Sequence, residues 1–196
     1  MREYQYRQTL SEKLLEDRII HITTPIYPET VSAIIPQLLY LDSENNESIS
    51  IYIGSPGGDV YTCMALHDTM KFIKSPVCTL GMGMVASAAQ FLLTSGEKGK
   101  RFAFSNTKIL MHQPWSGGIQ GQTTDILIQA REMEQIRDMM YGYTAKYSGQ
   151  DLETIKRDAE RDKYMTAIQA KEYGLIDHVI SSKDDFIAIL TAENTN

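Results

Sequence analysis

Hydrophobic and polar positions along the chain fall into blocks that switch between the strand period and the helix period. The strand-like runs are short and rich in β-branched residues, whereas the helix-like runs repeat apolar residues every three or four positions. The pattern predicts strands over residues 18–22, 48–53, 77–80, 102–104, 108–111 and 177–180. It predicts helices over residues 29–45, 60–74, 87–95, 123–147, 151–158, 167–173 and 184–190.

Alternation of strands and helices is typical of the α/β class. Successive β-α-β units imply a mostly parallel sheet with right-handed crossovers. The 196 residues contain no repeat, low-complexity tract or proline-rich linker. We therefore expect residues 1–196 to form a single domain.

Charge and composition exclude several classes of function. The chain has 25 acidic and 19 basic residues, and no basic stripe that would displace counterions from a nucleic acid. The longest apolar stretch, residues 84–93, is too short to span a membrane, and the first residues lack the apolar core of a signal peptide. These observations predict a cytoplasmic protein that binds neither nucleic acid nor membrane, with Cys63 and Cys78 reduced.

Cofactor sites are not indicated either. No histidines or cysteines have the spacing of metal ligands, and the Gly81-Met82-Gly83 turn lacks the lysine of a phosphate-binding loop. The sequence thus predicts no metal, no cofactor and no ATP hydrolysis by this chain.

Ser87 is the first candidate for chemistry. It follows a predicted strand and a glycine-containing turn, and it opens a helix of small residues. This placement exposes a hydroxyl beside the free backbone N–H groups of a helix start, which can stabilise an oxyanion. The alternative interpretation is an ordinary helix N-cap.

Four further residues are candidates on weaker local signals. Gly57 and Gly58 end a strand and leave bare backbone at its carboxyl end, or else simply form a turn. His112 ends another strand, where it is a candidate general base or else a core imidazole. Asp162 precedes a capped helix, where it orients an imidazole or belongs to a solvated charge run.

Five segments, taken in their order along the chain, are more specific than any one of these signals. They resemble the proteolytic subunits of the Clp protease (ClpP) family, with a similarity that extends over residues 14–179. The segments are Ile53–Gly58, Gly83–Ala88, Lys98–Phe102, Met111–Pro114 and Glu160–Asp162.

The resemblance implies a serine endopeptidase with a catalytic triad. Ser87 would be the nucleophile, His112 the base, and Asp162 the residue that orients His112. The backbone N–H groups of Gly58 and Ala88 would form the oxyanion hole.

The same resemblance implies positions that bind an extended substrate and positions that contact a second ring. The substrate-binding residues would be Gly57, Asp59, Val60, Gly117 and Ile119. The ring contacts would be Gln113 and Arg161. Tyr52 and Phe72 match aromatic positions that dock a ring-shaped ATPase, with ordinary core aromatics as the alternative.

The implied architecture is a crotonase-like head of β/α repeats with a protruding strand–helix handle, here about residues 115–148. Family members form two stacked seven-membered rings and degrade unfolded proteins that an AAA+ unfoldase of the Clp type delivers. The expected function is therefore an ATP-dependent serine endopeptidase subunit, in which the partner unfoldase and not this chain uses ATP.

Several departures from the family pattern keep an alternative open. The segment before Leu14 is short, Ala88 replaces a common methionine, and Phe104-Ser105-Asn106 replaces a common Leu-Pro-Asn. Such changes are typical of divergent paralogues. The subunit is therefore expected either to form rings by itself, or to be a catalytically weak or structural subunit that needs another ClpP. An acyl-CoA enzyme of the same fold is disfavoured, because it has no need for Ser87, His112 and Asp162 together.

Overall fold

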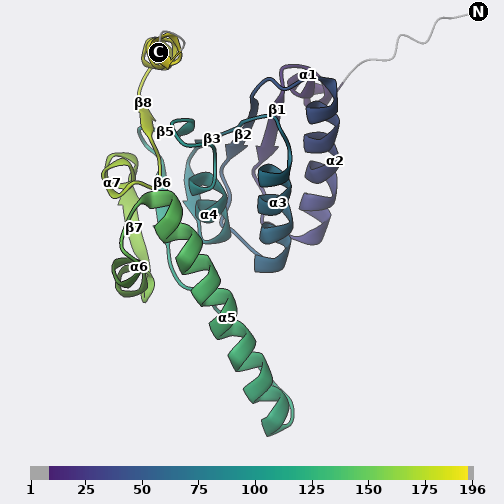
Figure 1. Ribbon diagram of the computed structural model, residues 1–196, viewed down its shortest axis with the longest axis vertical. Coiled ribbons are helices and arrows are strands. Elements are labelled where there is room, and N and C mark those ends of the chain that lie inside the picture. Colours follow the sequence, from purple (N-terminus) through teal and green to yellow (C-terminus); the bar gives the residue numbers. More distant parts are fainter. Residues whose placement is uncertain (1–8, 194–196) are drawn as a thin grey trace, which may run out of the picture.

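A computed structural model describes residues 9–193 of the chain, and Figure 1 shows its arrangement. The helices are α1 (Leu10–Glu16), α2 (Pro28–Glu44), α3 (Val60–Phe72), α4 (Ala88–Thr94), α5 (Thr123–Ser148), α6 (Leu152–Ala159), α7 (Ala167–Tyr173) and α8 (Lys183–Glu193). The strands are β1 (Ile19–Ile22), β2 (Ile49–Ile53), β3 (Val77–Gly81), β4 (Met84–Ala86), β5 (Arg101–Phe104), β6 (Lys108–Met111), β7 (Lys163–Thr166) and β8 (His178–Ile180).

The strands form two sheets rather than one. Five strands, in the order β1-β2-β3-β5-β8, make an all-parallel sheet. The second sheet has the order β4-β6-β7, with β4 parallel and β7 antiparallel to β6. The first sheet agrees with the predicted parallel pairing, and the second sheet carries the segments that matter for function.

The two faces of the five-stranded sheet are covered unequally. Alternate side chains of β2, such as Ile51, are fully buried in the main core with residues of α2, α3 and α4. The opposite face carries Tyr52, Leu80 and Phe102, and α8 covers this smaller cluster in part through Phe186. Because strand side chains alternate between faces, β2 contributes to both clusters.

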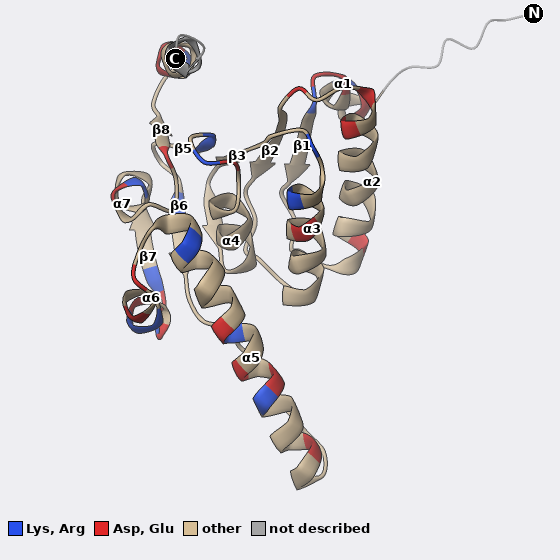
Figure 2. Cartoon of the chain, viewed as in Figure 1, with Lys and Arg blue, Asp and Glu red and all other residues tan. Residues whose placement is uncertain are grey.

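Helix α5 projects away from the two sheets as a long arm (Figure 1). Acidic and basic residues both occur along it (Figure 2), as the mixed charges of the sequence predict. The first part of the arm nevertheless exposes Ile126, Leu127 and Ile128, of which Ile128 is 63% exposed. Apolar residues exposed together on a projecting helix are a candidate contact surface.

The sequence pattern missed three elements and misplaced several ends by one to three residues. Helix α1 has no buried residue, so it lacks an amphipathic signature, although Thr9 and Glu12 form a capping box at its start. Strands β4 and β7 are short and lie inside segments that we interpreted as turn and loop.

The strand part of the handle, residues 117–121, is expected to pair with its counterpart in a second ring. In the described part of the chain this segment pairs with no strand, and it bends at Gly117 and Gly121. A strand needs a neighbour to satisfy its backbone groups, and no neighbouring strand lies alongside this glycine-rich segment in the described chain.

Candidate active site

Ser87 occupies a strained turn between β4 and α4. Its backbone has φ 57° and ψ −124°, a conformation that a residue with a side chain rarely adopts. Ser87 stands at the N-cap position, but its side chain makes no capping hydrogen bond. The side chain of Ser87 therefore does not act as an ordinary N-cap, and its backbone is strained at a strand-to-helix turn.

The strained turn is held by neighbouring backbone on both sides. The N–H of Ser87 donates to the carbonyl of Leu110 on β6 at 2.9 Å, and the N–H of Ala86 donates to the carbonyl of Ser55 at 3.0 Å. Gly57 lies against the turn, since a Cβ at this position would be 2.9 Å from the Cβ of Ser87. The φ of Gly57 is 91°, a backbone conformation that favours glycine, so Gly57 forms the turn that the sequence predicted.

His112 and Asp162 meet because β6 and β7 are antiparallel. Their register pairs Met111 with Lys163, which places the next residues outward, His112 and Asp162, side by side. The Nδ1 of His112 lies 3.0 Å from Oδ1 of Asp162. The side chain of Asp162 is 56% exposed and that of His112 is 17% exposed. Asp162 is therefore a surface charge that is also paired with the imidazole of His112.

The second sheet brings Ser87 to the same place. Strand β4 pairs with β6 so that Ala86 is opposite Leu110, and Ser87, one residue further along, lines one pocket with Met111 and His112. The Nε2 of His112 is buried and has no hydrogen-bond partner in the described chain. Nε2 is therefore without a partner in the pocket, whereas Nδ1 is paired with the carboxylate of Asp162.

Two backbone N–H groups near Ser87 are also unengaged. Within residues 9–193, neither the N–H of Gly58 nor that of Ala88 donates a hydrogen bond, and Ala88 is the first residue of α4. Gly58 is fixed by a parallel bridge to Ile26, whose backbone leaves no room for a Cβ. The N–H of Gly58 thus lies in a loop held by the bridge to Ile26, and the N–H of Ala88 lies at the start of α4.

The predicted substrate-binding residues are only partly brought together. Val60 and Ile119 line a groove of about 400 Å³ beside the site, together with Asp59 and Trp115. The carboxylate of Asp59 caps α3 by accepting from the N–H of Thr62 at 2.7 Å, and its backbone N–H donates to the carbonyl of Ile26 at 2.8 Å. Gly57 lies under Ser87, and Gly117 lies in the exposed bends of the handle and does not line the groove.

The predicted ring contacts lie beside the imidazole–carboxylate pair. Gln113 donates from Nε2 to the carbonyl of Glu160 at 3.1 Å, and Arg161 is exposed. Both line a shallow hollow with His112 and Asp162. A contact at this surface would therefore act directly on the orientation of His112.

Sequence reasoning missed one wall of the pocket. Met140, Tyr141 and Thr144 on α5 and Ile155 on α6 line it opposite Ser87. The helical spacing of Tyr141, Thr144 and Ser148, the buried residues of α5, was the available signal, but the many charges of this helix indicated a solvent-exposed arm.

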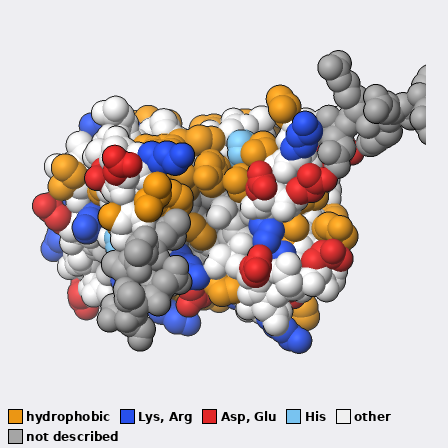
Figure 3. All heavy atoms as spheres, turned by 90° about the horizontal axis from the view of Figure 1, so that it is seen from above, with side chains coloured by type: hydrophobic (Ala, Val, Ile, Leu, Met, Phe, Trp, Pro, Cys, Tyr) orange, Lys and Arg blue, Asp and Glu red, His pale blue; other side chains and the backbone are white. Residues whose placement is uncertain are grey.

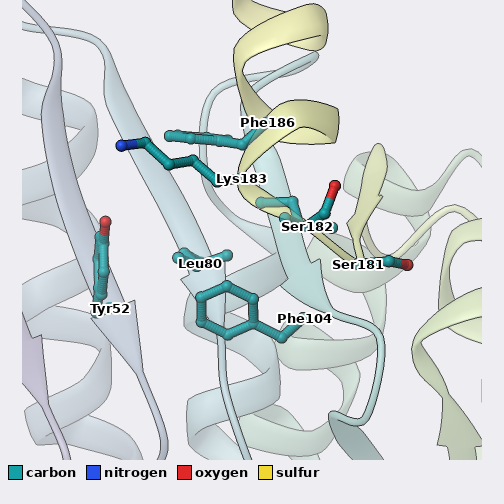
Figure 4. Close-up of a pocket in the computed structure, with 8 residues that line it drawn as sticks. Tyr52, Leu80, Phe104, Ser181, Ser182, Lys183 and Phe186 are labelled. Carbon is teal, nitrogen blue, oxygen red and sulfur yellow. The ribbon is translucent and has the colours of Figure 1, made fainter.

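The aromatic positions expected to dock a partner differ in their surroundings. Tyr52 lines an apolar cleft of about 370 Å³ on the less covered face of the main sheet, with Leu80, Phe104 and Phe186 (Figure 4). In the view from above the molecule, hydrophobic side chains gather near the middle of the surface (Figure 3). Phe72 does not line this cleft, and it is 82% exposed at the end of α3.

The sequence matches the Clp protease family over residues 2–183, nearly the whole chain. The chain belongs to the Clp protease family, whose members are serine peptidases. The predicted class, an α/β fold of the ClpP and crotonase type, is thereby confirmed. Among residues 9–193, no helix is long and apolar enough to cross a membrane, and no group of three metal-binding side chains is found.

Replacing Gly57 by alanine should disable the turn that holds Ser87. The new Cβ would lie 2.6 Å from the carbonyl oxygen of Ala86, so the turn must shift. We expect the peptidase kcat/KM to fall by about 100-fold, the cost of a 1 Å misplacement. Gly149→Ala is the matched control, because Gly149 has φ 76° but open space around its Cβ. Equal loss of activity in both variants would contradict the prediction.

Proposed function

We propose that this protein is a serine endopeptidase subunit that hydrolyses peptide bonds of unfolded proteins. The observation that carries the proposal is that Ser87, in its strained turn, lines one pocket with His112, whose other ring nitrogen is paired with Asp162. A nucleophile, a base and an orienting carboxylate define this chemistry by geometry and not by order along the chain.

The reaction follows from these groups. The Oγ of Ser87 attacks the carbonyl carbon of the scissile bond while its proton passes to Nε2 of His112. The resulting oxyanion accepts hydrogen bonds from the N–H groups of Gly58 and Ala88. His112 then protonates the leaving amine as the carbon–nitrogen bond breaks, and water hydrolyses the acyl-enzyme by the same steps in reverse.

The proposed working form is a double ring of two stacked heptamers around a chamber, homomeric or mixed with a paralogue. The exposed apolar residues of α5, such as Leu127 and Ile128, support a ring–ring contact through the handle. The cleft at Tyr52 supports docking of an AAA+ unfoldase of the Clp type, which would use ATP while this chain needs no cofactor. The cytoplasmic location stays a prediction from the sequence.

One observation favours the alternative of a weak or structural subunit. The Nε2 of His112 makes no hydrogen bond to Ser87 in the single chain. Because Gln113 and Arg161 adjoin the His112–Asp162 pair, a contact between rings could complete the alignment. On this reading the subunit is inactive until it assembles, with itself or with a paralogue.

Size-exclusion chromatography with light scattering tests the proposal. Each fraction is assayed with a short fluorogenic peptide and a serine-reactive fluorophosphonate probe. We expect cleavage and probe labelling to coincide in a two-ring species. Two-ring particles that neither cleave nor label would contradict the peptidase proposal, whereas inactive small species that become active only with a second ClpP would establish the mixed-ring form.

A further inference from the structure

Two buried side-chain polar atoms lack a hydrogen-bond partner in the described chain, and both residues line the pocket at Ser87. They are Nε2 of His112 and the hydroxyl of Tyr141. Burying a polar group without a partner is costly, so such an atom in a native structure needs an explanation. Proton transfer explains His112, but no step of the proposed mechanism uses Tyr141.

Tyr141 lies on α5 and is only 5% exposed. Burial raises the pKa of its phenol, so the hydroxyl is neutral and can both donate and accept a hydrogen bond. Two other polar residues of the pocket are already engaged: the hydroxyl of Thr144 donates to the carbonyl of Met140, and Gln90 donates to Thr94. Neither forms a hydrogen bond with the Tyr141 hydroxyl.

The free space in this pocket is small and mostly apolar. Its volume is about 30 Å³, room for roughly two water molecules or a side chain of two or three heavy atoms. Val60, Phe91, Met140 and Ile155 contribute apolar walls. A ligand group that enters must therefore be small, largely apolar, and able to hydrogen-bond at one point.

Resting on the proposed function, we propose that Tyr141 is a specificity-determining residue for the substrate side chain next to the attacked carbonyl. The pocket contains both Ser87 and Ala88, so the residue whose carbonyl meets them is the one that places its side chain there. The hydroxyl of Tyr141 selects a small hydroxyl-bearing residue, threonine or serine, over valine or alanine. A site built to pair a hydroxyl rejects an analogue without one, because the site's own polar group is then left buried and unpaired.

Matched peptide substrates test this assignment on the assembled protein. Pairs that differ only as threonine or valine, and as serine or alanine, before the scissile bond are compared by kcat/KM. The intact protein should prefer the hydroxyl member by about ten-fold or more. Tyr141→Phe should bring both ratios close to one, while cleavage of the valine peptide stays equal or rises.

Tyr40→Phe is the control, since it removes an exposed tyrosine hydroxyl on α2, away from the pocket. Tyr141→Phe removes an unpaired buried hydroxyl, so its melting temperature should not fall, which separates selectivity from misfolding. An active protein with no hydroxyl preference, or one whose preference survives Tyr141→Phe, overturns the inference alone. A two-ring protein without cleavage or fluorophosphonate labelling overturns the proposed function and, with it, the inference.

Discussion

Ser87→Ala should abolish both fluorophosphonate labelling and peptide hydrolysis. In a triad that acts as a unit, loss of the nucleophile alone lowers kcat by roughly a million-fold, because the base and the orienting group have nothing left to activate. The backbone donors at Gly58 and Ala88 remain, so residual turnover above the rate in water is still expected. Single-turnover hydrolysis of a fluorogenic peptide by the assembled variant gives the measurement.

The oligomeric state and fold should survive this substitution. The alanine side chain keeps the Cβ that contacts Gly57 and removes only a hydroxyl that makes no capping bond. Ser87→Gly is an informative partner, because glycine tolerates φ 57° without strain. In urea unfolding, Ser87→Gly should be more stable than Ser87→Ala by about 1 kcal/mol. Glycine relieves the backbone strain of the folded state, and this gain is partly offset because glycine makes the unfolded chain more flexible. Substantial hydrolysis by pure Ser87→Ala would place the nucleophile elsewhere.

Asp177→Asn should cause the largest loss of stability. Arg101 is 1% exposed and donates from its guanidinium to both carboxylate oxygens of Asp177, at 2.8 Å and 2.6 Å. Asparagine leaves this buried cation without a counter-charge, which costs about 3–5 kcal/mol. The guanidinium also donates to the carbonyls of Thr94 and Tyr147, so the pair ties the ends of α4 and α5 to β5. The free energy of unfolding from urea titration measures the loss.

The pair of Arg101 and Asp177 also makes the stability of the fold depend on pH. Burial alone would raise the pKa of Asp177, but hydrogen bonds and charge attraction from Arg101 hold it below its usual value. A carboxylate whose folded pKa is lower than its unfolded pKa stabilises the fold above the unfolded value, near pH 3.8. This contribution is lost as the pH falls through the folded pKa. Stability of the intact protein should therefore fall more steeply in acid than that of Asp177→Asn.

Two further variants test whether the buried ion pair causes the expected loss of stability. Lys156→Ala removes one partner of an exposed pair with Glu153 and should change stability by less than about 1 kcal/mol. The double change Arg101→Met with Asp177→Leu removes both buried charges and should be much less harmful than Asp177→Asn. If Asp177→Asn lowers the free energy of unfolding no more than Lys156→Ala does, the buried pair does not stabilise the fold as its geometry indicates.

The residues of the candidate site were predictable from the sequence, whereas their meeting was not. Ser87, His112 and Asp162 each carried only a local signal, and the resemblance to Clp proteases supplied their roles. Their proximity depends on β4, β6 and β7, and all three of these strands are three or four residues long without an alternating pattern. Such short strands exist through their pairing to a neighbour, which local periodicity does not record.

The sequence by itself determined the α/β class, the long helix at residues 123–147 and the strands of the main sheet, because each has a local period in its apolar residues. Only the tertiary structure decided that the strands divide into two sheets and that Ser87 has a strained backbone. It also left the hydroxyl of Tyr141 unpaired in the pocket that His112 lines. These features arise from contacts between residues far apart in the chain, whose energies depend on packing rather than on the order of neighbouring residues.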